Sequence, residues 1–505
     1  MKLVQSFLEE SAVRAPNKLA LICGEQRLTY AGIEAMANRL AQAFLANGVQ
    51  RGDRVLLFLP NAVEMVVGIF ATLKANAVFV PVNHSTKPDK LRFVAQDCRA
   101  AALLTWQRQA KTAVSLQKSI PSLQTIVIAG DEAPEGCLTF AEIQETFVAE
   151  RPSCHNIDQD LACLIYTSGS TGEPKGVMSA HSNVVFAASS IISYLQNQPD
   201  DIVLNVLPLS FDYGLYQLLM TFKFGGTLVL ERSFAYPAQI LKRIVAEKVT
   251  GFPLVPTIAA ILLQLDLSPY DFTSLRYLTN TAAALSPSRI TALQEKFPQA
   301  TLYSMYGLTE TKRTLYLPPE QLAVRSGSVG IPIPGTEAWV EDEAGNRLGP
   351  NEIGELVIRG SHVMRGYWER PEQSAARFRP GAIPGERLCY SGDLFRVDSE
   401  DFFYFIGRKD DIIKSRGEKV APKEIETVLS SLSGVVETAV IGIPDPVLGE
   451  AIKAFVVQKN GTLTKRDVLR HCRQHLEDFM VPQQIEFHAE LPKSSNGKIV
   501  KKELK

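Results

Sequence analysis

Short apolar runs alternate with helix-like stretches over most of the 505 residues. Such runs are typical of strands, and the stretches between them carry apolar residues at helical spacing. Alternation of this kind predicts an α/β fold of layers with largely parallel sheets. The predicted strands are 54–59, 77–82, 125–129, 162–167, 202–207, 227–231 and 276–281, and the clearest predicted helices are 62–74, 238–247 and 287–296.

The last ~95 residues have a pattern of their own, in the usual size range of a domain. The predicted elements are a strand at 402–406, a helix at 425–432, strands at 438–443 and 452–457 and a helix at 465–475. This order is an α+β pattern. We therefore predict a large N-terminal domain of residues 1–409 and a small mobile C-terminal domain of residues 410–505.

Composition excludes several classes of protein. The chain is 46% apolar and carries 53 Lys plus Arg against 54 Asp plus Glu, a net charge of -1, so it shows no electrostatic sign of a nucleic-acid or membrane partner. Its seven cysteines form no CxxC pair, which favours reduced thiols over disulfides or zinc. The first residues predict an amphipathic helix and no signal peptide. We expect a cytoplasmic protein.

A loop rich in glycine and hydroxyl groups follows the apolar run 161–165. Residues 166–176 read YTSGSTGEPKG, and backbone N–H groups, hydroxyls and an ammonium together suit a phosphate. The loop is not a Walker A motif, because no G-K-[S/T] follows at the required spacing. A flexible surface turn is the alternative. The predicted ATP-binding residues here are Thr167, Ser168, Gly169, Ser170, Thr171, Gly172 and Lys175.

Four further motifs follow in order: YGLTE at 306–310, YSGDL at 390–394, GRKDD with KSRG at 407–417 and PKSSNGK at 492–498. Together with the loop at 166–176, they resemble the adenylate-forming superfamily of acyl-CoA synthetases, nonribosomal-peptide adenylation domains and luciferases. The resemblance implies an enzyme that joins a carboxylic acid to AMP with ATP and Mg²⁺ and releases pyrophosphate. The acyl group then passes to a phosphopantetheine thiol.

The resemblance also implies roles for the nucleotide-site residues. Tyr306 stacks on adenine, Thr309 contacts the α-phosphate, and Glu310 binds Mg²⁺, which prefers oxygen ligands. Asp393 and Arg408 bind the ribose hydroxyls. An ordinary turn after the strand at 301–306, or ordinary loop charges, would explain the same residues without a function.

The C-terminal motifs imply a moving lysine. Lys498 reaches the carboxylate and the α-phosphate, where a positioned cation stabilises the charge that builds up. No general base is needed, since a carboxylic acid is already ionised at neutral pH. Asp410 acts as the hinge, and rotation there withdraws Lys498 and brings Gly417 to the site as part of a thiol tunnel.

Asp212 is the main indication of the substrate. It stands in LPLSFDYG, where peptide-synthetase relatives place an Asp for the substrate ammonium, so the resemblance favours an amino-bearing acid. The alternative is that Asp212 caps a helix. Transferred by position, the other pocket residues are Tyr213, Tyr216, Pro253, Thr279, Thr281, Met305, Arg313 and Thr314.

Lys312 and Arg313 together form a basic pair that leaves the acid undecided. Such a pair resembles that of enzymes for aspartate-like β-amino acids, where it holds a second carboxylate, but a solvated pair is the alternative. Aminobenzoates of the anthranilate type and α-amino acids also remain open. Residues 281–284 (TAAA) depart from the family, which commonly has a glycine there.

We expect a free-standing enzyme, because the sequence shows no carrier, condensation or thioesterase segment. Its acceptor is then a separate carrier protein or, alternatively, coenzyme A. A non-catalytic nucleotide-binding protein of the same fold is the hypothesis of another class. The presence of Lys175, Glu310 and Lys498 speaks against it.

Overall fold

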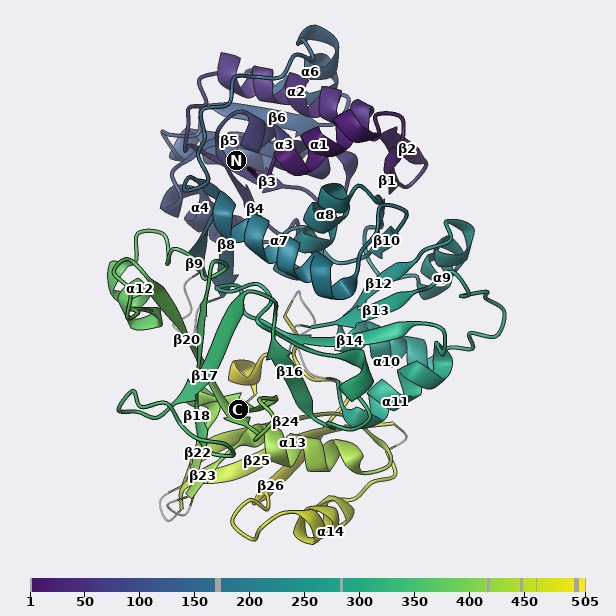
Figure 1. Cartoon of the computed structure of the whole chain (residues 1–505), viewed down its shortest axis with the longest axis vertical. Helices are drawn as coiled ribbons and strands as arrows, with labels where there is room; N and C mark the ends of the chain where they lie inside the picture. Colours follow the sequence, from purple (N-terminus) through teal and green to yellow (C-terminus); the bar gives the residue numbers. More distant parts are fainter. Residues whose placement is uncertain are drawn as a thin grey trace.

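The computed structural model describes residues 2–168, 174–281, 285–415, 418–445, 448–459, 461–494 and 499–504. Within these ranges the strands form three sheets, of seven, fourteen and five strands. Figure 1 shows the seven-stranded sheet with its helices at one end of the molecule and the five-stranded sheet at the other. In the part of the chain so described, no helix is long and apolar enough to cross a membrane.

The seven-stranded sheet is parallel except at one edge. Helices separate most of its parallel strands along the chain, and its central strands are almost wholly buried, as expected for a parallel sheet covered on both faces. The strand order is β7 (Leu138–Thr139), β6 (Thr125–Ala129), β5 (Ala100–Trp106), β3 (Arg54–Phe58), β4 (Val78–Pro81), β8 (Leu161–Ser168) and β9 (Pro174–Ala180). The helices of this part are α2 (Tyr30–Ala46), α3 (Val63–Lys74), α4 (Pro88–Asp97), α5 (Ala110–Ser119) and α6 (Phe140–Thr146).

The fourteen-stranded sheet has a parallel half and an antiparallel half. The parallel half comprises β1 (Leu19–Cys23), β11 (Thr227–Leu230), β10 (Ile202–Asn205), β12 (Gly251–Leu254), β13 (Tyr277–Asn280) and β14 (Thr301–Tyr306), with β2 (Gln26–Thr29) antiparallel at the edge. Its helices are α7 (His181–Leu195), α8 (Asp212–Phe224), α9 (Pro237–Ala246), α10 (Pro256–Gln264) and α11 (Pro287–Lys296).

The antiparallel half covers residues 315–408, and there the prediction of largely parallel sheets is wrong. Connections such as 398–402 between β20 and β21 are too short for the crossover helix that parallel neighbours need. The strands are β15 (Leu315–Leu317), β16 (Ser328–Pro332), β17 (Thr336–Glu341), β18 (Ile353–Gly360), β19 (Phe378–Pro380), β20 (Arg387–Val397) and β21 (Phe403–Arg408), with α12 (Pro371–Arg377) before β19.

The five-stranded sheet has its own apolar core, which includes Ile413, Val440 and Ile452. β21 ends at Arg408 in the large sheet and β22 begins at Ile413 in the small one, so the chain changes sheets near the predicted boundary. The division at Asp410 and a hinge there remain predictions. The elements are β22 (Ile413–Ser415), β23 (Glu418–Val420), α13 (Pro422–Ser431), β24 (Val435–Asp445), β25 (Gly449–Gln458), α14 (Lys465–His475) and β26 (Gln484–His488).

The first helix, α1 (Ser6–Arg14), is amphipathic as predicted and buries Phe7 and Leu8. Ser11 donates from Oγ to the carbonyl of Phe222 at 2.7 Å, and the Arg14 guanidinium donates to the carbonyl of Phe224 at 3.2 Å. These bonds satisfy carbonyls at the C-terminal end of α8. α1 therefore holds the far end of the helix that begins with Asp212.

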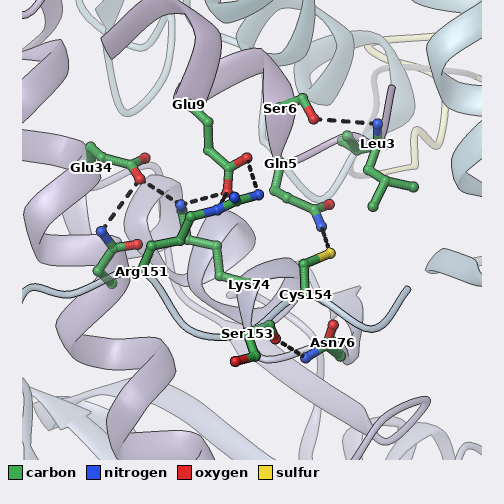
Figure 2. A network of polar contacts seen from close by, with 12 residues as sticks. Leu3, Gln5, Ser6, Glu9, Glu34, Lys74, Asn76, Arg151, Ser153 and Cys154 are labelled. Carbon is green, nitrogen blue, oxygen red and sulfur yellow. Dashed lines mark hydrogen bonds and ion pairs between the residues drawn. The ribbon is translucent and has the colours of Figure 1, made fainter. Parts of the chain in front are cut away.

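An ion network ties α1 to its neighbours (Figure 2). Lys74 at the end of α3 is 3% exposed, and its Nζ lies 2.9 Å from Glu9 of α1 and 2.7 Å from Glu34 of α2. Arg151 contacts Glu9 from outside at 2.8 Å. The buried ammonium is thus fully compensated, which is the condition for a stable buried charge.

Candidate functional site

The nucleotide half of the site begins where β14 ends. The backbone turns sharply after Tyr306, and a Cβ at Gly307 would lie 1.9 Å from the carbonyl oxygen of Lys312, so only glycine fits. Tyr306 donates its hydroxyl proton to Asp393 Oδ2 at 2.5 Å. Asp393 in β20 pairs in register with Arg408 of β21, whose Nε lies 3.5 Å from Oδ1. Three predicted ligands from separate motifs therefore lie together.

Burial sets the protonation of this group. Asp393 is 4% exposed, and burial raises its pKa above the ordinary value, although Arg408 and the Tyr306 hydroxyl oppose the shift. Burial, reinforced by Asp393, raises the pKa of Tyr306 well above 10, so the phenol keeps its proton. The pair is a donor and an acceptor fixed in one orientation.

Glu310 lies in the turn after Tyr306, next to Thr309. Its Oε1 accepts from the Tyr367 hydroxyl at 2.6 Å and lies 3.8 Å from Nε of Arg377. The Nζ of Lys175, on β9 after the phosphate loop, lies 5.5 Å from the centre of the Tyr367 ring. Glu310 and Lys175, which are predicted to bind Mg²⁺ and the phosphates, therefore both lie beside the side chain of Tyr367.

The residues present fit a magnesium ion that arrives with a nucleotide. Among the residues placed in the structure, no cluster of three or more His, Cys, Asp or Glu side chains is suited to hold a metal. Mg²⁺ in nucleotide sites is commonly held by one or two carboxylates together with phosphate oxygens and water. Glu310 supplies such a carboxylate.

The predicted acid pocket lies along β12, β13 and β14. Pro253, Thr279 and Tyr303 are neighbours across these three strands. The hydroxyl of Tyr213 in α8 lies 2.8 Å from the carbonyl oxygen of Thr279 and 2.6 Å from its Oγ1. Met305 accepts a hydrogen bond at Sδ from a tyrosine of α7. The α8 helix is therefore fixed against the strand that carries Thr279.

Asp212 is already paired within the chain. It is 5% exposed, and its carboxylate lies 2.8 Å from Lys312 Nζ and 3.9 Å from Arg313 Nη1. Asp212 therefore has cations within the chain, and its contact with a substrate amine stays a prediction. The helix-cap alternative is wrong: Asp212 is the first residue of α8, and the cap residue Phe211 makes no side-chain cap.

The basic pair is buried. The side chains of Lys312 and Arg313 are 0% and 3% exposed, so the solvated alternative is wrong. Lys312 has a φ of +60°, an uncommon conformation for this residue, at the turn from which its side chain reaches Asp212. Arg313 stacks over the Tyr213 ring at 4.5 Å and Lys312 lies 5.9 Å from the ring centre of Tyr216.

The charges of this cluster do not cancel. One carboxylate faces two cations, so Asp212, Lys312 and Arg313 carry a net charge of about +1 in a buried place. Four buried polar atoms of this cluster have no hydrogen-bond partner within the described ranges: Asp212 Oδ1 and Lys312 Nζ, which form the ion pair, the Tyr216 hydroxyl and Arg313 Nε. Unsatisfied buried groups of this kind are costly unless a ligand completes them.

Residues 8–368 match the AMP-binding enzyme family, and residues 424–498 match the C-terminal domain of AMP-binding enzymes. The chain belongs to the AMP-binding enzyme family. The long-chain-fatty-acid–CoA ligase of Bacillus subtilis (strain 168) is 32% identical over 535 residues, which cover 100% of this chain and 94% of the ligase.

Two solved structures resemble this AMP-binding enzyme over almost its whole length. The anthranilate CoA ligase AuaEII in complex with anthranoyl-AMP superposes with a TM-score of 0.91 at 29% identity, covering 99% of this chain and 95% of that chain. ATP-bound MatB from Rhodopseudomonas palustris superposes with a TM-score of 0.90 at 28% identity, covering 100% and 98%. This AMP-binding enzyme is thus an adenylate-forming acid–thiol ligase that uses ATP, and the predicted α/β fold is confirmed.

Not every predicted residue of the AMP-binding enzyme can be placed. Thr167 lies in β8, Thr281 is buried directly after β13, and Thr314 Oγ1 lies 2.7 Å from that of Thr311. Asp410 is exposed in a short 3-10 turn, Lys409–Asp411. The side chain of Ser168, together with Gly169, Ser170, Thr171, Gly172, residues 282–284, Gly417 and Lys498, lies outside the described residues.

Sequence reasoning missed two side chains that contact predicted ligands. Tyr367 and Arg377 both approach Glu310, and neither belongs to a motif. Arg377 ends α12, whose sequence PEQSAAR is that of an ordinary surface helix. A single sequence carries no signal that would have found them.

Proposed function

We propose that this enzyme activates an amino-bearing aromatic acid of the aminobenzoate type and passes the acyl group to a phosphopantetheine thiol. The observation that supports the acid is the Asp212–Lys312 pair at 2.8 Å. A carboxylate that already has a cation gains little from an ammonium but still has free acceptor capacity. An aryl amine is neutral at pH 7 and donates a hydrogen bond without adding charge.

The charge count disfavours the other amino acids to different degrees. An α-amino acid with an apolar side chain would bring its ammonium beside a cluster of net charge about +1, at the cost of like-charge repulsion in a poorly solvated place. An aspartate-like β-amino acid is the second candidate, because its second carboxylate would offset that charge. The unpartnered Arg313 Nε favours it.

Tyrosines support an aromatic acid over a long alkyl chain. Tyr213 and Tyr216 are both buried in α8, and aromatic rings pack favourably on one another. A solved relative holds anthranoyl-AMP, the adenylate of an aminobenzoate, and is described as a CoA ligase. Coenzyme A and a carrier protein present the same phosphopantetheine thiol, so this thiol is the proposed acceptor, with a separate carrier protein as the alternative to coenzyme A.

The nucleotide roles form the second part of the proposal. Tyr306 stacks on adenine, Asp393 and Arg408 bind the ribose, and Lys175 contacts the phosphates. Glu310 contributes a carboxylate to Mg²⁺, whose chemistry when bound is to neutralise phosphate charge. Their support is the hydrogen bond from Tyr306 to Asp393 and the common contact of Glu310 and Lys175 with Tyr367.

Thr309 and the C-terminal residues complete the proposed cycle. Thr309 donates to the α-phosphate while Lys498 stabilises the attacking carboxylate. Rotation about Asp410 then exchanges Lys498 for the Gly417 segment and admits the thiol. Among these, the support for the hinge is the change of sheets between Arg408 and Ile413.

Pyrophosphate release with 2-aminobenzoate and benzoate tests the acid. We expect kcat/KM to favour 2-aminobenzoate by about 10-fold or more, the scale of a hydrogen bond to a charged acceptor. The variant D212A/K312M removes the Asp212–Lys312 pair and keeps the net charge of the cluster at about +1, because Arg313 remains, and it should bring the ratio close to one. A wild-type preference for benzoate, or a ratio that survives in the double variant, would refute the role of Asp212.

The acceptor is tested in the same reactions. Coenzyme A and a phosphopantetheinylated carrier protein are supplied separately, and the acyl thioester is detected by mass spectrometry. Thioester with either thiol supports the proposed acceptor and identifies its source. Acyl-adenylate that accumulates in the presence of both would contradict it.

A further inference from the structure

Arg377 lies between two motifs that the nucleotide site brings together. Its Nε is 3.8 Å from Glu310 Oε1, on the turn after β14. Its Nη1 reaches the backbone of β20, since a Cβ at Gly392 would lie only 2.7 Å from that nitrogen. Gly392 has a φ of +66° and directly precedes Asp393. One guanidinium, from a third element, α12, therefore lies beside the proposed metal carboxylate and beside Gly392, the residue that precedes the proposed ribose carboxylate.

The charge of Arg377 acts on all the surrounding groups. The Arg377 side chain is 17% exposed. Burial lowers the pKa of its guanidinium, but the nearby acidic groups, first Glu310 and then others that include Asp393, raise this pKa above its ordinary value. Arg377 in turn opposes the rise in the pKa of Asp393, whereas Glu310 adds to it. Arg377 therefore offsets part of the repulsion between the like charges of these two carboxylates.

Two buried atoms nearby lack hydrogen bonds. Arg377 Nε, a donor, and Asp393 Oδ1, an acceptor, have no hydrogen-bond partner in the part of the chain that the structure describes. The 3.5 Å contact of Asp393 with Arg408 is an ion pair that involves an exposed side chain. In the nucleotide site, opposite charges therefore lie close together, but not every buried donor and acceptor forms a hydrogen bond.

We propose that Arg377 is a positioning residue of the nucleotide site, whose guanidinium holds Glu310 and Asp393 together in the orientation that metal-bound phosphates and ribose require. Tyr367 and Tyr306 each fix one of the two carboxylates, and Arg377 couples them. The proposal rests on the proposed roles of Glu310 and Asp393. It does not depend on which acid is activated.

Binding and kinetics of Arg377→Met test this coupling. AMP is titrated without metal by calorimetry, which reports the adenine and ribose contacts, and pyrophosphate release is measured against Mg²⁺ concentration. We expect the Kd for AMP and the half-saturating Mg²⁺ concentration each to rise roughly 10–100-fold, the usual effect of losing an outer-shell partner. Arg379→Met is the matched control, since Arg379 is exposed two residues along and stacks on Tyr390; both values should change less than about twofold.

The conservative variant keeps the proposal testable if Arg377→Met does not fold. Arg377→Lys keeps the charge but not the planar fork, so both values should shift in the same direction by a smaller factor. A lower melting temperature with unchanged Kd and half-saturation, in either variant, would show a merely structural role and overturn the proposal.

Reference variants separate this proposal from the roles on which it rests. Asp393→Asn should weaken AMP, and Glu310→Gln should raise the half-saturating Mg²⁺ concentration. Unchanged values in these two would refute the underlying roles and the coupling together. If Asp393→Asn and Glu310→Gln have these effects but Arg377→Met has none, only the proposed role of Arg377 would be refuted.

Discussion

Lys312 should decide whether the pocket accepts a neutral amine or an ammonium. The test variant is Lys312→Met, which removes the charge and keeps a similar length. The matched acids are 2-aminobenzoate and its saturated analogue cis-2-aminocyclohexanecarboxylate, whose amine is an ammonium at neutral pH. We expect wild type to prefer the neutral amine and the variant to move towards the ammonium.

The distances from Asp212 to its two cations give the expected size of this change in substrate preference. At an effective dielectric constant of ~20, the 2.8 Å contact with Lys312 corresponds to ~6 kcal/mol of attraction and the 3.9 Å contact with Arg313 to ~4 kcal/mol. The variant frees the larger attraction for an incoming cation and leaves Asp212 partly compensated. If about a quarter of the Asp212–Lys312 attraction, roughly 1.4 kcal/mol, becomes available to the substrate ammonium, kcat/KM for that acid changes about tenfold. The ratio of kcat/KM for the two acids should therefore shift by about 10–100-fold.

The assay is pyrophosphate release with each acid, for wild type, Lys312→Met and the exposed control Lys242→Met. Circular dichroism and thermal melting establish that the variants fold. A ratio that changes less than about twofold in a folded Lys312→Met enzyme would show that Lys312 does not set the charge of the pocket. The proposed neutral amine would then lose its physical basis.

The remaining predictions concern the moving lysine, the hinge and buried histidines. Lys498→Ala should slow adenylation by roughly 10²–10³-fold while thioester formation from supplied acyl-adenylate survives; near-normal pyrophosphate release would exclude the role. Asp410→Pro fixes φ and should spare one half-reaction and block the other; equal loss of both in a folded variant would place the hinge elsewhere. Burial lowers the pKa of His181 and of His362 to about 4. Between pH 6.5 and 4 the unfolded state therefore binds more protons than the folded state. As the pH falls through that range, the free energy of unfolding decreases by up to about 3 kcal/mol per histidine. His181→Gln should flatten the melting temperature over that range, and a profile as steep as wild type would contradict it.

Strand and helix positions followed from periodicity wherever local pattern determines structure. The prediction of helix 287–296 and strand 125–129 matches α11 and β6 residue for residue. The antiparallel strands of 315–408 were missed as such, because periodicity reports the burial of a strand and not which strand lies beside it. Partner choice depends on connection length and on the rest of the sheet.

The site was predictable as a set of motifs but not as a set of contacts. The order of the motifs placed Tyr306 and Asp393 in one nucleotide site, and the structure joins them by a hydrogen bond. The partner of Asp212 was not foreseen, since Lys312 lies a hundred residues later at a turn of positive φ. Burial of a lysine is uncommon enough that sequence alone favours the exposed alternative.

The attachment of α1 has a consequence for the order in which the chain can mature during synthesis. Ser11 bonds to the carbonyl of Phe222, 211 residues further along. At ribosomal rates of 5–20 residues per second, the first helix emerges roughly 10–40 s before its partner in α8. Over that interval the apolar face with Phe7 and Leu8 has no α8 to cover it, so α1 can dock in its final place only after α8 has been made.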